Sequence, residues 1–279
     1  MMFRNQVTSD QLRRNFPAIF AESEKNTLSD KYLYIPTYKL VENLERQGFS
    51  IVGAKQQGSR SLSREHAKHV VYMTHADQKN KTLDKVGDEL PMLALTNSHN
   101  GLSSFALDTA FFRLVCSNGL MMPTNSFSSA RIVHKVGMET DVINAAYRVV
   151  SNFAKQIETI NAMKSVELNS SEQKLLASSA SRMAFDEKII ELNAERNPIE
   201  QRLLQARRYD DKKNDLWTTF NVIQENVIKG GFRVIRENEN GQRSIARTRA
   251  VNSLDRDAKL NKELMALAQE MLKLKTGVA

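Results

Sequence analysis

Histidines are the first side chains of this 279-residue sequence whose placement could support chemistry. His99 and Asn100 stand in a polar turn between two apolar runs, a position where a general base or a metal ligand can sit. A base needs a nucleophile and an orienting partner, and the neighbouring sequence offers neither, whereas Asn, Ser and Gly are ordinary turn formers. We therefore expect His99 to be a polar turn residue and assign no catalytic residue.

His66, His69 and His75 surround one predicted strand. Because side chains alternate between the faces of a strand, His66 and His69 point to opposite faces. His69 and His75 share a face but lie about 20 Å apart at roughly 3.3 Å per residue. These histidines therefore cannot converge on one metal ion, and we predict no metal site.

Other catalytic signals are also missing from the sequence. The single cysteine, Cys116, lies in an apolar run, which favours a small buried side chain over a reactive thiol. There is no Walker loop, dinucleotide-binding fingerprint or His-Glu-x-x-His word. We therefore expect a protein that is not an enzyme and takes no cofactor.

Basic residues supply the stronger pattern. The net charge of +8 favours an anionic partner, nucleic acid above all. Basic residues gather in two segments, one over residues 55–68 and one over residues 233–249. If the end of the second segment is extended, Arg243, Arg247 and Arg249 point the same way beside small hydroxyl residues, which suits phosphate contacts. The alternative is a solvated loop neutralised by carboxylates such as Glu237. The candidate nucleic-acid-binding residues of both segments are Lys55, Arg60, Arg64, Lys68, Arg233, Arg236, Arg243, Arg247 and Arg249.

The elements that must position these residues change along the chain. Residues 1–30 are predicted to form an N-terminal arm, 31–137 an α+β sheet core, and 138–279 a helical region with a basic loop at 230–250. Within the core we expect a helix over 37–47 capped by Thr37, and the strands listed next. They lie near 49–57, 67–75, on both sides of the turn at 97–101, and over 131–136. The predicted fold class is α+β, with an antiparallel sheet-rich N-terminal half and a helical C-terminal half.

Two stretches of the sequence carry a family resemblance that extends over most of the chain. They are Thr96-Asn-Ser-His99-Asn100-Gly101 with Arg113-Leu-Val-Cys116-Ser117-Asn118, and Trp217-Thr-Thr-Phe220-Asn221 with Glu225-Asn226 and the segment Arg247-Thr-Arg249. Both resemble the phage/plasmid-like protein family, which is carried by phages, prophages and conjugative plasmids and has no assigned activity. That family more often has Asp where this chain has Asn100, and Thr or Ala where it has Ser117. The missing carboxylate weakens an acid–base role for His99.

The order of the predicted elements also resembles that of ring-forming single-strand annealing proteins of recombination. This resemblance implies binding of single-stranded DNA along basic grooves, without metal or nucleotide, and assembly into a homo-oligomer. The last helix agrees with assembly because its apolar residues have heptad spacing. They are Leu260, Leu264, Leu267, Met271 and Leu274. Packing of this seam on the chain's own 216–227 helix is the alternative.

These observations predict a phage- or plasmid-derived protein of the bacterial cytoplasm that binds nucleic acid, with single-stranded DNA favoured, in recombination or replication. The single cysteine favours a reducing compartment. We expect no secretory leader, because the first residues lack its charged-then-apolar layout, and no membrane span, because no run approaches about 18 apolar residues. The alternative belongs to another class: a non-catalytic inhibitor that binds and blocks a host defence complex. That role needs no catalytic residue either.

Overall fold

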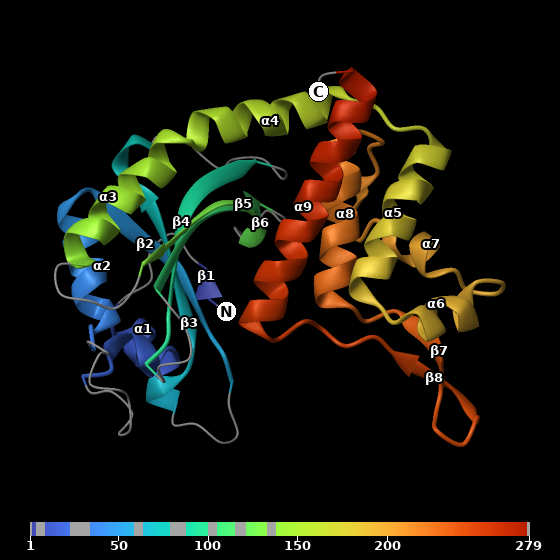
Figure 1. The fold of residues 1–279 in the computed structure, drawn as a ribbon, viewed down its shortest axis with the longest axis horizontal. Coiled ribbons are helices and arrows are strands. Elements are labelled where there is room, and N and C mark those ends of the chain that lie inside the picture. The colour runs from blue at the N-terminus through green and yellow to red at the C-terminus, as the bar shows by residue number, and fades with distance from the viewer. Residues whose placement is uncertain are drawn as a thin grey trace. The chain divides into compact units, whose positions relative to one another are not determined.

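The computed structural model describes residues 2–3, 9–22, 34–58, 64–78, 88–99, 105–114, 121–132 and 138–277. The chain divides into two compact units, residues 1–154 and 155–279, and each is described by itself. Figure 1 shows strands in the first unit and mainly helices in the second. Within the described residues no helix has both the length and the apolar character needed to cross a bilayer.

The first unit is built on a six-stranded antiparallel sheet whose strand order follows the chain. The strands are β1 (Met2–Phe3), β2 (Phe49–Gln56), β3 (His69–His75), β4 (Glu89–Asn97), β5 (Phe105–Leu114) and β6 (Met121–Ile132). Runs of Val, Leu, Met and Phe favour these strands, and side chains on both faces of β3 and β4 are buried. Of the strand predicted over 131–136, Arg131 and Ile132 belong to β6, and residues 133–136 lie outside the described residues.

Two helices and an N-terminal segment complete the core of the first unit. The helices α2 (Thr37–Arg46) and α3 (Met138–Ser151) contact each other, and α2 packs on β2 while α3 packs on β4 to β6. The N-terminal segment contains α1 (Ser9–Asn15) and the short 3-10 helix η1 (Pro17–Phe20). Residues 9–22, which the sequence placed in an arm over 1–30, contribute Leu12, Phe16 and Ile19 to the core.

Thr37 does not cap α2 as the sequence suggested. The residue before the helix is Pro36, and no side chain caps the first turn. Thr37 is instead the first helical residue, and it is fully buried with its hydroxyl bonded to other side chains. The helix ends before Gly48, whose φ of 89° is in the left-handed region that glycine tolerates.

The second unit is helical apart from one hairpin. Its helices are α4 (Phe153–Ser165, which begins at the end of the first unit), α5 (Ser170–Ala184), α6 (Glu187–Asn193), α7 (Ile199–Leu203), α8 (Leu216–Lys229) and α9 (Leu254–Thr276). The second unit also contains the short 3-10 turn η4 (Tyr209–Asp211). Two other 3-10 turns, η2 (Arg64–His66) and η3 (Ala76–Gln78), belong to the first unit. Side-chain caps define three of the starts: Asn169 with Glu172 for α5, Asp215 for α8 and Ser253 for α9. The antiparallel sheet in the N-terminal half and the helices in the C-terminal half confirm the predicted α+β class.

The segment predicted as a basic loop at 230–250 is a β-hairpin. Strand β7 (Arg233–Glu237) pairs antiparallel with β8 (Arg243–Arg247), and the tip turns at Gly241, which has a φ of 74°. In Figure 1 the tip projects beyond the helices of its own unit. The extended conformation considered for Arg243 to Arg247 is confirmed, and the strand that pairs with it is β7.

The terminal helix α9 packs inside its own unit. It contacts α5 and α8, and Leu260, Leu264 and Met271 are buried. Leu274, the last residue of the predicted seam, is 78 % exposed. The alternative given by the sequence, packing on the 216–227 helix, is therefore what the structure has, and α9 supplies no argument for a homo-oligomer.

Candidate nucleic-acid interface

The candidate site is the arginine hairpin, defined as β7, β8 and Arg249, which is the second residue after β8. Cross-strand pairs place Arg233 opposite Arg247 and Glu237 opposite Arg243, so these four side chains share one face of the ribbon. Arg236 pairs with Ser244 and lies on the other face. The strand ends at Arg247, and Arg249 follows in an irregular segment. The prediction that Arg243 and Arg247 share one face of an extended strand is therefore confirmed, whereas Arg249 lies outside that strand.

Asparagine side chains hold the outer edge of β7. The Asn193 amide donates to the carbonyl of Ile235 (3.0 Å) and accepts from its N–H (2.8 Å), as a neighbouring strand would. The Asn197 amide donates to the carbonyl of Arg233 at 2.8 Å. Asn193 is fully buried, so both backbone groups of Ile235 are satisfied away from water. The helix–hairpin junction is thus fixed by directional bonds.

A close backbone approach holds the base of the hairpin. Gly230 ends α8 with a φ of 58°, and a Cβ there would come within 2.8 Å of the Arg249 carbonyl oxygen. The N–H of Gly231 donates to the Thr248 carbonyl at 2.9 Å, and the Thr248 N–H donates to the Phe232 carbonyl at 2.9 Å. Glycine is required here by the positive φ and by the lack of space.

Two of the hairpin arginines already have partners. Nε of Arg243 lies 3.2 Å from a carboxylate oxygen of Glu237, whose other oxygen lies 2.9 Å from Nζ of Lys188. Hydrogen bonds from Lys188, and then Arg243, hold the pKa of Glu237 below its usual range. Arg247 donates to the carbonyl of Gly231 at 3.1 Å. Glu237 therefore offsets the charge of Arg243, as the alternative of a solvated, neutralised segment predicted.

The other three arginines of the hairpin are available for a ligand. Arg233, Arg236 and Arg249 are exposed, and among the residues that the structure describes none of their guanidinium groups has an acceptor. Each guanidinium presents several N–H donors in a planar fork that matches a phosphate. These three side chains are the part of the predicted set best suited to bind an anion.

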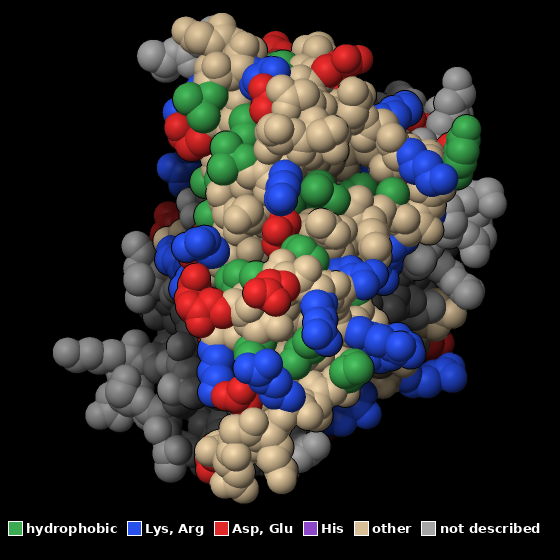
Figure 2. Space-filling view, turned by 90° about the vertical axis from the view of Figure 1, so that its right-hand side faces the viewer, with side chains coloured by type: hydrophobic (Ala, Val, Ile, Leu, Met, Phe, Trp, Pro, Cys, Tyr) green, Lys and Arg blue, Asp and Glu red, His purple; other side chains and the backbone are tan. Residues whose placement is uncertain are grey.

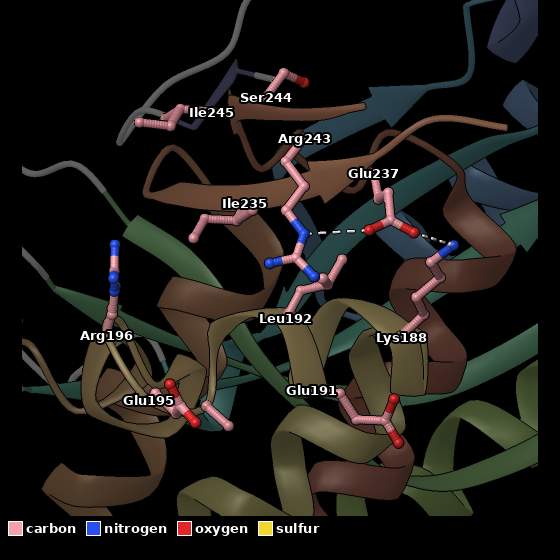
Figure 3. A pocket seen from close by; sticks show the side chains of 11 residues that line it. Lys188, Glu191, Leu192, Glu195, Arg196, Ile235, Glu237, Arg243, Ser244 and Ile245 are labelled. Carbon is pink, nitrogen blue, oxygen red and sulfur yellow. Dashed lines mark hydrogen bonds and ion pairs between the residues drawn. The ribbon is translucent and has the colours of Figure 1, made fainter. Parts of the chain in front are cut away.

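A pocket of about 810 Å³ lies between α6 and the hairpin. Figure 3 shows Arg243 reaching across it toward Leu192, with Glu237 between Arg243 and Lys188. Ile235 and Ile245 add apolar surface, and the Ile245 side chain is 72 % exposed. Carboxylates and basic groups alternate around the rim, so the pocket itself has no excess of positive charge.

The first basic segment lies in the other unit. Lys55 is in β2, where it pairs with Val70 of β3, Arg64 begins η2, and Lys68 precedes β3. Arg60 lies outside the described residues. A guanidinium nitrogen of Arg64 contacts the Asn15 carbonyl at 3.5 Å. The structure thus keeps Lys55, Arg64 and Lys68 around one hairpin, and this set and the arginine hairpin belong to separate units.

Charge is mixed on the face drawn in Figure 2, where Lys and Arg side chains are interspersed with Asp and Glu side chains. Basic side chains are more frequent toward the lower half of that view. Mixed surfaces of this kind are common on soluble proteins. Net charge alone therefore does not locate the site, and the surroundings of each arginine decide which of them can bind an anion.

The turn histidine belongs to a buried polar cluster that the sequence did not predict. Thr37, His69, Asn97 and His99 are all fully buried. Thr37 Oγ1 lies 2.8 Å from Nε2 of His69 and receives a bond from the Asn97 amide at 2.9 Å. The rings of His69 and His99 are 5.1 Å apart. The spacing of histidines along one strand does not reveal this cluster, because it is the pairing of β3 with β4 that brings His69 beside Asn97.

Hydrogen-bond partners define the protonation of both rings in this cluster. Nδ1 of His69 lies 2.9 Å from the Ala67 carbonyl and donates to it, so Nε2 accepts from the Thr37 hydroxyl. Nε2 of His99 lies 2.9 Å from the Ala18 carbonyl and donates to it. Burial lowers the pKa of His69 to about 4, although the bond to Ala67 opposes this shift. Among the described residues no group of His, Cys, Asp and Glu gathers as a metal site would require.

The α8 part of the second stretch that carries the family resemblance is also buried, whereas Arg247 and Arg249 of the same stretch are exposed. Asn226 in α8 donates to the carbonyls of Leu203 (3.0 Å) and Gln205 (2.9 Å). Glu225 bonds to Arg208 and Lys229, and those bonds hold its pKa below the usual range against the opposing effect of burial. Both stretches therefore join distant backbone segments within their own units.

Comparison with known proteins places the chain in a family. Residues 26–265 match the family described as "Domain of unknown function (DUF932)". The chain belongs to the DUF932 family. Two proteins of Escherichia coli (strain K12) are similar over 268 residues, which cover 95 % of this chain and 92 % of each relative: UPF0380 protein YafZ, 37 % identical, and UPF0380 protein YfjQ, 36 % identical. No solved structure matches. The DUF932 match spans both units, so the buried polar cluster and the arginine hairpin lie within the family region.

Proposed function

We propose that the protein binds nucleic acid, with single-stranded DNA favoured, through the arginine hairpin, and that it acts in recombination or replication on a phage or plasmid. The observation that carries the proposal is the set of exposed guanidinium groups on Arg233, Arg236 and Arg249, which have no acceptor among the described residues. A two-stranded ribbon that projects from its unit can present such groups to a phosphate backbone.

The physical basis is the release of counterions. A lysine or arginine that contacts a phosphate displaces condensed cations, so the logarithm of the affinity falls with the logarithm of salt concentration, by about 0.7 per contact for a single strand. Three contacts from Arg233, Arg236 and Arg249 correspond to a slope of about 2. Arg243 adds less because Glu237 already holds its Nε.

The test is a salt titration of binding to labelled oligonucleotides by fluorescence anisotropy. Replacement of Arg233, Arg236 and Arg249 by Ala should weaken binding and lower the slope by about 2. The matched control replaces the exposed lysines Lys155, Lys164 and Lys174, which lie on α4 and α5, and removes the same net charge. Equal losses from both triple variants would mean that net charge attracts the ligand and that the hairpin is no site. Absence of binding at low salt would refute the proposal.

Self-assembly is part of this proposal only through the resemblance to annealing proteins. The terminal helix α9 is covered within its own unit, so it gives no reason for a second copy. Static light scattering with and without an oligonucleotide decides the matter. A monomer mass near 31.7 kDa in both conditions would remove annealing by a ring from the proposal.

A second candidate is the protein-binding inhibitor of a host defence complex. One observation favours it: Ile245, on the outer strand of the hairpin, is 72 % exposed beside the pocket. Leu192 and Ile235 line the same pocket, and contiguous apolar surface of this kind can mark a protein-binding site. Ile245→Glu should abolish binding to a protein partner while leaving the salt slope with DNA unchanged. The opposite pattern, lost DNA binding and retained protein capture, would remove this candidate.

A further inference from the structure

The most exposed large apolar side chain among the described residues is Tyr209, at 82 %. It begins the 3-10 turn η4, between α7 and α8. An aromatic ring in water leaves a large apolar area unburied, which a loosely built turn would tend to cover. The exposed position of Tyr209 indicates a binding role only if contacts hold the turn and keep the ring from packing onto the protein.

Buried ion pairs hold that turn on both sides of Tyr209. Nε of Arg208 lies 2.8 Å from a carboxylate oxygen of Asp211, and the other nitrogens of Arg208 bond to Glu225 of α8. The side chains of Asp211 and Glu225 are almost completely buried. The Asn226 amide also fixes the carbonyl of Gln205, just before the turn. The backbone on either side of Tyr209 is thus anchored to α8, and the ring is presented outward.

The same turn lies beside the arginine hairpin. Arg207 donates from Nε to the Asn226 side-chain oxygen at 2.8 Å and from Nη2 to the carbonyl of Gly230 at 2.6 Å. Gly230 ends α8 immediately before the hairpin. One guanidinium therefore connects the turn of Tyr209 to the base of the arginine hairpin.

A basic group lies over the ring, and a second one follows it in the chain. Nζ of Lys212 lies 5.2 Å from the centre of the Tyr209 ring, and Lys212 and Lys213 are exposed without a carboxylate partner among the described residues. Asp210 is exposed on the same turn and partly offsets them, whereas Asp211 is engaged by Arg208. The turn combines an exposed aromatic ring with one ammonium group over it and a second lysine next in the chain, a combination that suits a stacked base and its phosphate.

We infer that Tyr209 stacks on an unpaired base of the nucleic acid that the arginine hairpin binds, with Lys212 and Lys213 contacting its phosphates. The inference rests on the proposed function and adds a reason for single-strand preference. Bases of a duplex are stacked on one another and offer no free face, whereas every base of a single strand does. Because all bases have such a face, the contact tolerates any sequence.

The experiment compares Tyr209→Ala and Tyr209→Phe with the unchanged protein. Affinity is measured for a labelled single strand and for a duplex of the same length at one salt concentration. The alanine variant should bind the single strand roughly 5- to 100-fold more weakly, while the phenylalanine variant stays within about threefold. Duplex affinity and the salt slope should not change, because stacking releases no counterions. Leu274→Ala, at another exposed apolar side chain, is the matched control.

An abasic oligonucleotide isolates the stacking step, because it keeps the phosphates and lacks the bases. The alanine variant and the unchanged protein should bind it equally. Equal weakening of single strand and duplex by Tyr209→Ala, or no weakening of either, would overturn the stacking inference and leave the proposed function intact. If the unchanged protein bound no oligonucleotide, both would fall. If phenylalanine failed to restore binding, the hydroxyl and not the ring would be responsible, which also contradicts stacking.

Discussion

Acidification should destabilise the first unit through His69. The ring is fully buried and neutral, and its Nε2 accepts the Thr37 hydroxyl hydrogen. A second proton on this ring would point at Thr37 Oγ1, which already receives the Asn97 amide. Burial consequently lowers the pKa of His69 from 6.5 to about 4. The unfolded chain therefore takes up this proton at a higher pH than the folded protein does.

The magnitude follows from that difference in pKa. The contribution of His69 to the free energy of unfolding is complete above about pH 6.5 and decreases as the pH falls toward 4. The shift corresponds to about 3 kcal/mol in total at about 1.4 kcal/mol per pKa unit, and to about 2 kcal/mol between pH 7.5 and pH 5. This range lies above the usual titration of most carboxylates, so their contribution is small.

The assay is urea unfolding followed by far-UV circular dichroism at pH 7.5, 6 and 5. His69→Gln should be less stable at pH 7.5 but should lose about 2 kcal/mol less than the unchanged protein on going to pH 5. His75→Gln, at the other end of β3 and outside the cluster, is the control and should keep the full pH dependence. The same pH dependence in His69→Gln and in the unchanged protein would refute the reasoning.

Four further outcomes are expected. Gly230→Ala should lower the free energy of unfolding by about 2 kcal/mol or more in urea titrations, because the new Cβ meets the Arg249 carbonyl and the φ is unfavourable. Asn193→Ala should cost about 2 kcal/mol by the same measurement, since it removes both bonds to Ile235. Gln224→Leu should lower the melting temperature, because it leaves the buried side-chain oxygen of Asn261 without the Gln224 donor. His99→Gln should leave oligonucleotide affinity within twofold in anisotropy titrations, because the side chain is buried. A hundredfold loss of activity with an intact fold would instead reopen a catalytic role for His99.

Local patterns predicted most of the elements. The spacing of Tyr38, Val41 and Leu44 and the following Gly48 predicted α2, and apolar runs predicted β2 to β5. Strand β6 was placed too late because Pro123 and its serine-rich neighbours have no apolar alternation. Pairing with β5 determines that strand, and such pairing is invisible in a local window.

The candidate site was predicted less completely. The sequence identified the hairpin arginines, but it could not separate Arg243, whose charge Glu237 offsets, from Arg236 and Arg249, because that distinction depends on strand pairing. Tyr209 was missed for a related reason. An aromatic residue in a charged segment is noticeable in the sequence, but its exposure follows from the contacts of Arg208 with Asp211 and Glu225.

The buried polar cluster also selects the alignment of two strands. Side chains on both faces of β3 and β4 are buried, so a slip of two residues would still place apolar side chains in the core. Hydrophobic burial alone would scarcely distinguish the slipped pairing from the native one. A slip would, however, separate His69 from Asn97 and Thr37 and leave several buried polar groups without partners. The buried polar cluster thus favours one register of β3 against β4, in a sheet whose apolar side chains alone do not select a register.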